Sequence, residues 1–333
     1  MTTILAVMQD SLLLLESSKS DWKSEELMRG TNPQCISFDY RNSDLAYCGT
    51  FGNGLWKTHD AGHSWNRIGM RDISNDYITS VSVSHLKTRV YIGTEPSTIY
   101  RSDDGGESWQ KMASLDNLKS SKSWSFPPRP YTSHVRWIEQ DANNPDYVFV
   151  AIEAGALVQS HDGGNTWIDR VEGGPYDTHT MATHKMAPKR LYSAAGDGYF
   201  ESIDYGQSWK RLTAGLEHDY AFGLAIDPLD PKSIILSTSE TARKAHIIEE
   251  ANSSIYRKSG EEWELISNGL PASSGTIISI LASNPNTSGM FYAINNRGIF
   301  YSSNSCVSWR VLDINWPKEY VLQHPRALAV IEG

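Results

Sequence analysis

Short apolar runs alternate with turns rich in Gly, Asn, Asp and Pro along most of the chain. In the first complete unit, four such runs lie at residues 35–38, 45–49, 54–58 and 65–68. Apolar runs of this length, bounded by turn-forming residues, are typical of β-strands. The pattern therefore predicts an all-β protein in which each unit contributes four strands.

One turn pattern, Ser/Thr-x-Asp-x-Gly-x-Ser/Thr-Trp, is repeated at residues 58–65, 102–109, 160–167 and 202–209. The aspartate can accept hydrogen bonds from N–H groups of the turn, the glycine permits a positive φ, and the tryptophan returns to the core. A copy at residues 302–309 has lost the Asp and the Gly. Because the aspartates recur once per unit, we interpret them as structural rather than catalytic. They are Asp60, Asp104, Asp162 and Asp204.

Seven tryptophans mark seven units, at positions 22, 65, 109, 167, 209, 263 and 309, separated by 43, 44, 58, 42, 54 and 46 residues. A repeat of about 40 residues made of short strands is the period of a propeller blade. The repeated turn resembles that of the Asp-box (BNR-repeat) family, which includes sialidases, sortilin, photosystem II assembly factors and glycosyl hydrolase-like proteins. The resemblance implies a seven-bladed β-propeller, but not an activity, because these proteins differ in function.

We expect one domain over residues 1–333, with blades at 31–70, 76–113, 132–171, 177–213, 220–267 and 276–312, and a seventh made of 324–333 plus 1–28. The seventh blade takes its inner strand from the C-terminal end and its other strands from the N-terminal end. Closing the ring in this way removes a free sheet edge. Residues 1–16 resemble a signal peptide, but they lack a basic leader, and Gln9 and Asp10 divide them into two strand-sized runs.

The charge and cysteine content narrow the classes of partner and location. The chain has 30 Lys and Arg against 39 Asp and Glu, a formal net charge of −9, which does not favour binding to nucleic acid or to an anionic membrane. An odd, sparse set of cysteines, Cys35, Cys48 and Cys306, favours a reducing compartment. No apolar run has the length of a membrane span. We therefore expect a cytoplasmic protein.

The inner strands of the seven units align on one apolar position, which is Ile36 in the first unit. Two residues before that position stand Gln34, Thr79, Arg136, His179, Phe222, Ser279 and Arg326. Two residues earlier again stand Asn32, Tyr77, His134, Asp177, Tyr220, Ile277 and His324. The family resemblance implies that these strand starts face the mouth of the central channel, where ligands bind. Converging polar groups are typical of a ligand or active site, although they can also simply solvate a channel.

The residue types at the mouth indicate possible roles. Arg136 and Arg326 suit a carboxylate or phosphate, which guanidinium groups bind bidentately. His179 and His134 suit proton transfer, with Asp177 orienting a histidine. The other expected ligand-binding residues are His324, Tyr77, Tyr220 and His218. A divalent metal held by His134, His179 and His324 is an alternative, because three imidazoles with an open position suit a catalytic ion.

The leading hypothesis is a propeller that binds a small anionic ligand at the channel mouth and acts on it as a hydrolase or lyase by histidine acid–base chemistry. Sialidase activity is not expected, because the chain lacks an Arg-Ile/Leu-Pro segment and Asp177 is the only acidic residue that the alignment places at the mouth. The alternative is a non-catalytic scaffold that binds a protein partner through the channel rim and the loop of residues 114–133, which carries Trp124. A second long loop, residues 240–254, is expected on the same rim.

Overall fold

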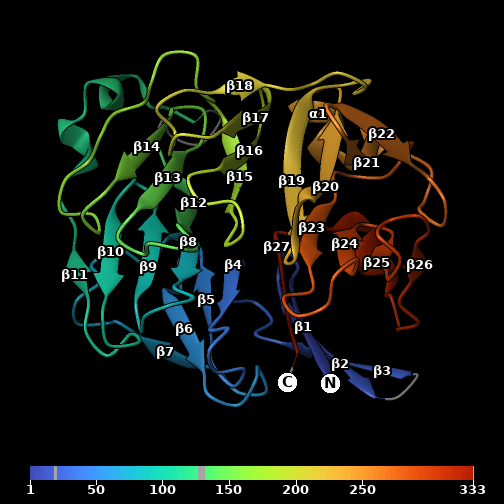
Figure 1. The fold of residues 1–333 in the computed structure, drawn as a ribbon. Coiled ribbons are helices and arrows are strands. Elements are labelled where there is room, and N and C mark those ends of the chain that lie inside the picture. Colours follow the sequence, from blue (N-terminus) through green and yellow to red (C-terminus); the bar gives the residue numbers. More distant parts are fainter. Residues whose placement is uncertain (19–20, 127–131, 333) are drawn as a thin grey trace.

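The protein is a ring of seven antiparallel sheets around a central axis (Figure 1). The computed structural model describes residues 1–18, 21–126 and 132–332. The innermost strand of each sheet contacts the innermost strands of the two neighbouring sheets. The fold is therefore a seven-bladed β-propeller, as the sequence predicted.

Blades 1 to 4 follow one another along the chain, and their strands run from the axis outward. Blade 1 contains β4 (Pro33–Phe38), β5 (Ala46–Thr50), β6 (Leu55–Thr58) and β7 (Asn66–Ile68), and blade 2 contains β8 (Ile78–Val83), β9 (Val90–Thr94), β10 (Ile99–Ser102) and β11 (Gln110–Lys111). Blade 3 contains β12 (Val135–Gln140), β13 (Val148–Ile152) and β14 (Ala156–Ser160), and blade 4 contains β15 (Thr178–Thr183), β16 (Leu191–Ala195), β17 (Gly198–Ser202) and β18 (Lys210–Arg211). In blade 3 a bridge between Gln159 and Ile168 takes the place of a fourth strand.

Blades 5 and 6 have the same outward order. Blade 5 contains β19 (Tyr220–Asp227), β20 (Asp230–Ser239), β21 (Ser253–Ser259) and β22 (Glu262–Ile266), and blade 6 contains β23 (Ile280–Ser283), β24 (Phe291–Asn295), β25 (Gly298–Ser302) and β26 (Arg310–Val311). The helices are short: α1 (Ala242–His246) and the 3-10 turns at Leu115–Asn117, Lys119–Ser123, Ile248–Glu250 and Lys318–Leu322. Within the ranges that the structure describes, none of the helices is long and apolar enough to cross a membrane.

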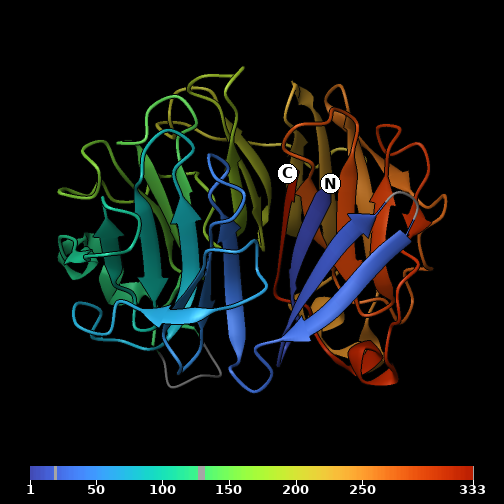
Figure 2. The same ribbon diagram turned by 90° about the horizontal axis from the view of Figure 1, so that it is seen from below.

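Blade 7 joins the two ends of the chain. It contains β27 (Ala327–Glu332), β1 (Thr2–Val7), β2 (Leu12–Ser18) and β3 (Asp21–Leu27). β27 pairs antiparallel with β1, from Thr2 opposite Glu332 to Val7 opposite Ala327. Figure 2 shows the red C-terminal strand lying beside the blue N-terminal strand. The predicted closure of the ring by both chain ends is confirmed.

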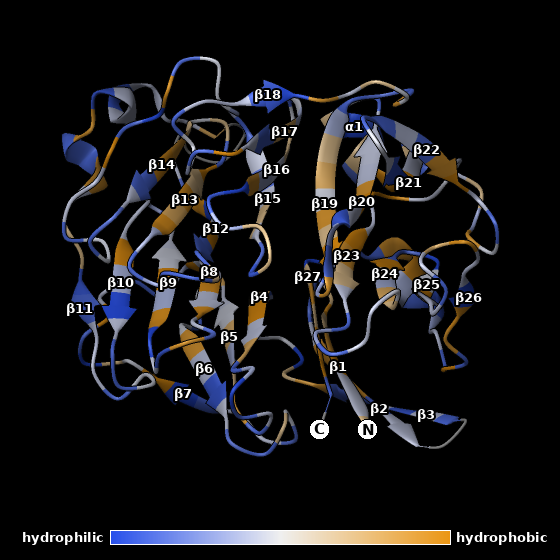
Figure 3. Cartoon of the chain, viewed as in Figure 1, coloured by the Kyte–Doolittle hydropathy of each residue, from blue (hydrophilic) through white to orange (hydrophobic). Residues whose placement is uncertain are grey.

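The core lies between the faces of adjacent blades. Every residue of β5, β9, β13, β16 and β24 is buried, because the second strand of a blade is covered on both faces. The outermost strands β11 and β18 are exposed and hydrophilic (Figure 3). Each large apolar side chain that is fully buried in this way contributes about 1.5–3 kcal/mol to folding.

The repeated turn joins the third strand to the fourth and is held by its own side chains. In the blade 3 copy, Thr166 donates to the Asp162 carboxylate through its backbone N–H at 2.9 Å and its hydroxyl at 2.6 Å. The backbone N–H of Gly164, at a φ of +90°, donates to Ser160 Oγ at 2.8 Å. The copy at residues 302–309 keeps this geometry, with Asn304 Oδ1 accepting from the Ser308 N–H at 3.1 Å. The turn therefore survives the loss of its charge.

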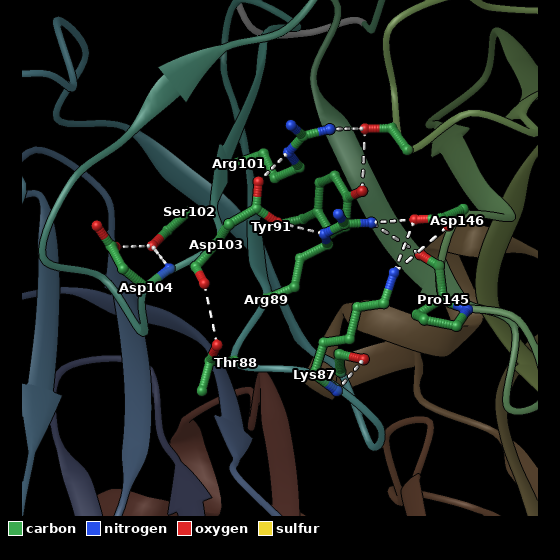
Figure 4. Close-up of polar contacts among 12 residues, drawn as sticks. Lys87, Thr88, Arg89, Tyr91, Arg101, Ser102, Asp103, Asp104, Pro145 and Asp146 are labelled. Carbon is green, nitrogen blue, oxygen red and sulfur yellow. Dashed lines mark hydrogen bonds and ion pairs between the residues drawn. The ribbon is translucent and has the colours of Figure 1, made fainter.

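Charged side chains link blade 2 to blade 3 close to a repeated turn (Figure 4). The Arg89 guanidinium donates to Asp103 and to Asp146, at 2.5 Å in each case. Arg101 donates to the carbonyl of Gly163 at 2.7 Å, inside the repeated turn of blade 3. Arg89 is mostly buried, with 11% of its side chain exposed, whereas both carboxylates remain half exposed. The cluster ties neighbouring blades together on their outer side.

Candidate functional site

At the channel mouth, the pairing of the inner strands with their neighbouring strands is irregular. The pairing register shifts between Pro33 and Cys35, Ile78 and Ser80, Val135 and Trp137, and Thr178 and Thr180, so one residue in each strand lies outside the ladder. These residues are Gln34, Thr79, Arg136 and His179, and in β19 a wider shift includes Phe222. Because a bulge re-aims the side chain of the extra residue, it frees that side chain from the alternation of the strand.

A cavity of about 320 Å³ opens where the inner strands begin. It is lined by Gln34, Thr79, Phe126, His134, Arg136, Glu153, Phe222, His246, His324, Pro325 and Arg326. A narrower channel of about 70 Å³ continues along the axis between apolar strand residues. Five of the residues that the alignment placed in one ring line both spaces: Gln34, Thr79, Arg136, Phe222 and Arg326. They form the junction between the mouth and the channel.

Glu153 is the acidic residue of this cavity that the sequence reasoning missed. The expectation that Asp177 is the only acidic residue at the mouth was wrong, because Glu153 lies in the turn after β13 and lines the cavity. Its backbone N–H donates to the carbonyl of His134 at 3.3 Å. The residue that follows the second strand of a blade therefore lies opposite the start of the inner strand of the same blade. Aligning the second strands as well would have found Glu153 and, in blade 2, the buried Glu95.

Glu153 is held ionised by its neighbours. Burial by itself raises the pKa of this carboxyl, but the hydrogen bond to His134 and the charges of His134 and Arg136 outweigh burial and lower it to about 2. His134 is 6% exposed and its Nε2 contacts Glu153 Oε2. Arg136 Nε lies 3.9 Å from the same oxygen. The carboxylate thus balances part of the positive charge of the site.

His179 is buried beside the cavity rather than in it. It is 1% exposed and is not among the described residues that line the cavity. Its Nδ1 lies 2.8 Å from the Ala221 carbonyl of blade 5. Its Nε2 lies 3.5 Å from Asp177 Oδ2, 3.9 Å from Glu153 Oε1 and 3.4 Å from the Tyr220 hydroxyl. The structure therefore brings the predicted His179–Asp177 pair together, in a position suited to holding other groups in place.

A second polar cluster brings a residue from the loop of residues 240–254. His246 Nδ1 lies 2.6 Å from His324 Nε2, and the Tyr220 hydroxyl lies 3.0 Å from His246 Nε2. Burial, followed by the positive charges of Arg326 and Arg136, lowers the pKa of His324 to about 4. Burial and the neighbouring histidines lower the pKa of His246 well below its usual range. Both imidazoles are neutral at neutral pH and act as hydrogen-bonding groups.

Other predicted residues lie away from the cavity or are grouped differently. Tyr77 is 46% exposed and packs on Phe51, with ring centroids 4.6 Å apart, and His218 is partly exposed with its Nε2 3.9 Å from Glu217. Asp177 and Tyr220 contact His179 behind the cavity. The three histidines of the alternative metal site, His134, His179 and His324, do not lie together as one group of potential ligands. Among the described residues, Glu153, Asp177 and His179 form the group that could hold a metal ion.

The loop of residues 114–133 contributes to the cavity through Phe126 rather than through Trp124. Trp124 is only 7% exposed; its indole N–H donates to Ser120 Oγ at 3.0 Å, and its side chain packs in the core of blade 3. Phe126 lines the cavity, its ring edge-on to His134 with centroids 5.0 Å apart. Residues 127–131, which belong to the loop of residues 114–133 that was predicted to bind a partner, lie outside the described residues.

Comparison with known proteins supports the fold. No protein-family model and no curated protein matches the sequence. Among solved structures, the chain is similar to an ancestral GH74 enzyme, at 15% identity and a TM-score of 0.61, over 90% of this chain and 38% of that one. It is also similar to YCF48 bound to D1 peptide, at 18% identity and a TM-score of 0.57, over 85% of this chain and 82% of that one. A chain of a nidogen/laminin complex matches at 10% identity and a TM-score of 0.53, over 99% of this chain and 98% of that one.

The chain is a seven-bladed β-propeller. At these identities the likeness extends to the fold alone. The chain spans 38% of the length of the GH74 enzyme, but 82% of YCF48 and 98% of the chain from the nidogen/laminin complex.

Proposed function

We propose that this propeller binds a small anionic ligand, bearing a carboxylate or a phosphate, in the cavity at the channel mouth. The observation that carries the proposal is the placement of Arg136 and Arg326. Arg136 lies in β12 of blade 3, Arg326 directly precedes β27 of blade 7, and both line the junction between cavity and channel. Guanidinium groups bind planar or tetrahedral oxyanions through paired N–H donors, so two of them directed into one cavity suit such a ligand.

The charge balance of the cavity supports the same ligand class. Glu153 offsets one positive charge, while His246 and His324 are neutral, because burial and nearby positive charge lower their pKa values. The Arg136 guanidinium lies over the Phe222 ring, 5.0 Å from its centroid, which holds it in place. Among the residues that line the cavity, two guanidinium groups thus stand against one carboxylate, and an excess of positive charge in a partly enclosed cavity attracts anions.

The proposal includes hydrolase or lyase chemistry by a hydrogen-bonded pair in the cavity. His134 lines the cavity and contacts Glu153, so His134 has the place that a proton-transfer residue needs and Glu153 can orient it. His179 and Asp177, which the sequence suggested for catalysis, are assigned to positioning. Turnover should therefore fall more in His134→Gln than in Tyr77→Phe, an exposed residue outside the cavity. Equal turnover in these two variants would contradict the assignment.

A thermal-shift panel of phosphates, small carboxylates and sugar acids tests the binding proposal. A ligand at 100 times its dissociation constant stabilises the folded state by about 2.7 kcal/mol, which corresponds to roughly 4 °C in Tm for a chain of this size. The shift should disappear in Arg136→Gln and in Arg326→Gln. It should persist in Arg310→Gln, a matched change on the exposed strand β26. A shift that survives in both cavity variants, or no shift with any ligand, would contradict the proposal.

A second candidate function is a protein-binding scaffold. The observation that favours it is that the propellers whose structures contain a partner, YCF48 with D1 peptide and the chain of the nidogen/laminin complex, match this chain over most of their own lengths. The rim near Phe126 is the proposed contact surface. Deleting residues 125–129, which leaves the buried Trp124 in place, should then abolish capture of a peptide selected from a displayed library. The same deletion keeps Arg136 and Arg326 and should leave an anion-induced thermal shift intact, and the reverse pattern would favour the small-ligand function.

We also infer that the chain belongs to the Asp-box (BNR-repeat) family, forms one domain over residues 1–333 and is cytoplasmic. Four turns with the same hydrogen bonds support the family assignment, and in the described structure all three cysteines are free thiols. Limited proteolysis that released a stable fragment would contradict the single domain. Cell fractionation that recovered the protein outside the cytoplasm would contradict the location.

A further inference from the structure

Three side chains at the edge of the cavity place potential ligand atoms close to one another. Glu153 comes from the β13–β14 turn of blade 3, Asp177 directly precedes β15 of blade 4, and His179 is the second residue of β15. One ligand atom from each lies within 4.8 Å of the other two. His179 Nε2 lies 3.5 Å from Asp177 Oδ2 and 3.9 Å from Glu153 Oε1. Ligands held about 2.1 Å from a tetrahedral ion are about 3.4 Å apart, so a small movement of the carboxylates closes this group around an ion.

Hydrogen-bond accounting leaves His179 Nε2 facing acceptors. The Pro325 carbonyl must accept from His324 Nδ1, at 2.6 Å, so neutral His324 has a bare Nε2 that accepts from His246 Nδ1. His246 Nε2 is then bare and takes the single hydroxyl proton of Tyr220. Since His179 Nδ1 donates to a backbone carbonyl, its neutral form has a lone pair on Nε2. His179 Nε2 thus faces two carboxylate oxygens and the oxygen of a hydroxyl whose proton is already used, a set of groups that a cation between them would satisfy.

The surrounding contacts match those that orient metal ligands. The N–H of Ala154 donates to Asp177 Oδ1 at 2.7 Å and leaves Oδ2 turned toward His179. His134 contacts Glu153 Oε2 and leaves Oε1 turned toward His179. A histidine that binds a metal usually donates its other N–H to a carbonyl or carboxylate, as His179 does toward Ala221. All three candidate ligands are thus held from behind by groups outside the site.

We propose that Glu153, Asp177 and His179 bind one divalent transition-metal ion, such as Zn²⁺ or Mn²⁺, between blades 3 and 4. One imidazole with two carboxylates is a mixed donor set that suits these ions, whereas Ca²⁺ takes six to eight oxygen ligands. Glu153 also lines the cavity, so the ion sits next to the proposed anion site. The metal site does not depend on the anion proposal, because its ligands are separate from Arg136 and Arg326.

Equilibrium dialysis of the chelator-stripped protein against Zn²⁺, Mn²⁺ or Ca²⁺, followed by elemental analysis, tests the site. We expect about one equivalent of Zn²⁺ or Mn²⁺ and no Ca²⁺, with at least a tenfold loss of affinity in His179→Gln and a loss of about 10–100-fold in His134→Gln, which touches a ligand from behind. The matched control is His184→Gln. His184 is also buried, but its Nε2 lies 2.8 Å from the Asp227 carbonyl and away from the site, so this variant should keep its metal.

Equal metal content in the wild type and His179→Gln, or less than a tenth of an equivalent in the wild type, would overturn the proposal. If circular dichroism shows that His179→Gln does not fold, Asp177→Asn takes its place, since Asp177 is partly exposed and asparagine has nearly the same shape as aspartate. Visible absorption of the Co²⁺-loaded protein gives a second readout, which should differ between the wild type and Asp177→Asn. Repeating the phosphate thermal-shift measurement in the presence of EDTA tests the anion site without a bound metal ion. A shift that persists in EDTA shows that the anion site is intact even if the metal site fails.

Discussion

Deleting residues 1–15 should abolish cooperative folding, because these residues form β1 and the larger part of β2, the second and third strands of the closing blade. The deletion removes eight large apolar side chains that are at most 4% exposed: Ile4, Leu5, Val7, Met8, Leu12, Leu13, Leu14 and Leu15. At about 1.5–3 kcal/mol each, their burial amounts to roughly 12–24 kcal/mol, which matches or exceeds the net stability of about 5–15 kcal/mol of a typical domain. The loss of β1 also leaves β27 without its partner strand.

The assay is urea denaturation followed by tryptophan fluorescence, with circular dichroism to detect residual strands. Leu5→Ala supplies the intermediate case: its side chain packs against blade 1, in the same cluster as Phe38, and its loss should lower the free energy of unfolding by about 2–5 kcal/mol. Leu86→Ala, at a side chain that is 54% exposed, should change it by less than about 0.5 kcal/mol. A truncated protein with the full-length unfolding midpoint would refute the reasoning.

Three further predictions concern the turns and the contact between blades. Asp162→Ala should lower stability by about 1–3 kcal/mol in thermal denaturation and leave any ligand affinity unchanged, since the carboxylate only accepts bonds within its turn. Hydroxyl donors within the turns lower the pKa values of Asp60 and Asp104 to about 2, so the contribution of these carboxylates to stability is present above pH 4 and is lost as the pH falls toward 2. The midpoint of urea denaturation should therefore fall between pH 4 and pH 2, and it should fall less in a variant that carries both Asp60→Asn and Asp104→Asn. Arg89→Ala should lower stability by about 1–3 kcal/mol, less at high salt, and Arg89→Lys should restore under half of it, because one ammonium cannot reach both carboxylates at 2.5 Å; full rescue by lysine would contradict the bridging role.

The repeat made most of the fold predictable from the sequence. A tryptophan recurs in all seven units and the turn motif in five of them, so the spacing of the tryptophans gave the number of blades, and the alignment of the inner strands placed Arg136 and Arg326 at the mouth. The alignment could not predict how deeply each aligned residue is buried. His179 and Arg136 share one aligned position and both lie at bulges, yet the imidazole turns to the carbonyl of the next blade and the longer guanidinium extends into the cavity.

Residues outside the inner strands were harder to place from sequence. Glu153 and His246 reach the cavity from a tight turn and from a helix in a long loop, and neither position belongs to the inner-strand pattern. Trp124 was misjudged because an aromatic residue in a long loop can either contact a partner or hold the loop to the core. Its burial against blade 3 depends on contacts between segments that no local pattern contains.

The bulge at Gln34 separates the identity of a mouth residue from the stability of its blade. Gln34 stands outside its ladder, and its amide donates to its chain neighbours Asn32 and Pro33, so a change of side chain there alters the shape and charge of the cavity with little effect on the packing between blades. Thr79 also stands outside its ladder, but it is buried and its hydroxyl donates to the Val135 carbonyl of blade 3 at 2.7 Å. The propeller can therefore acquire a new ligand preference at Gln34, and a library randomised there should retain a higher fraction of folded members than one randomised at Thr79.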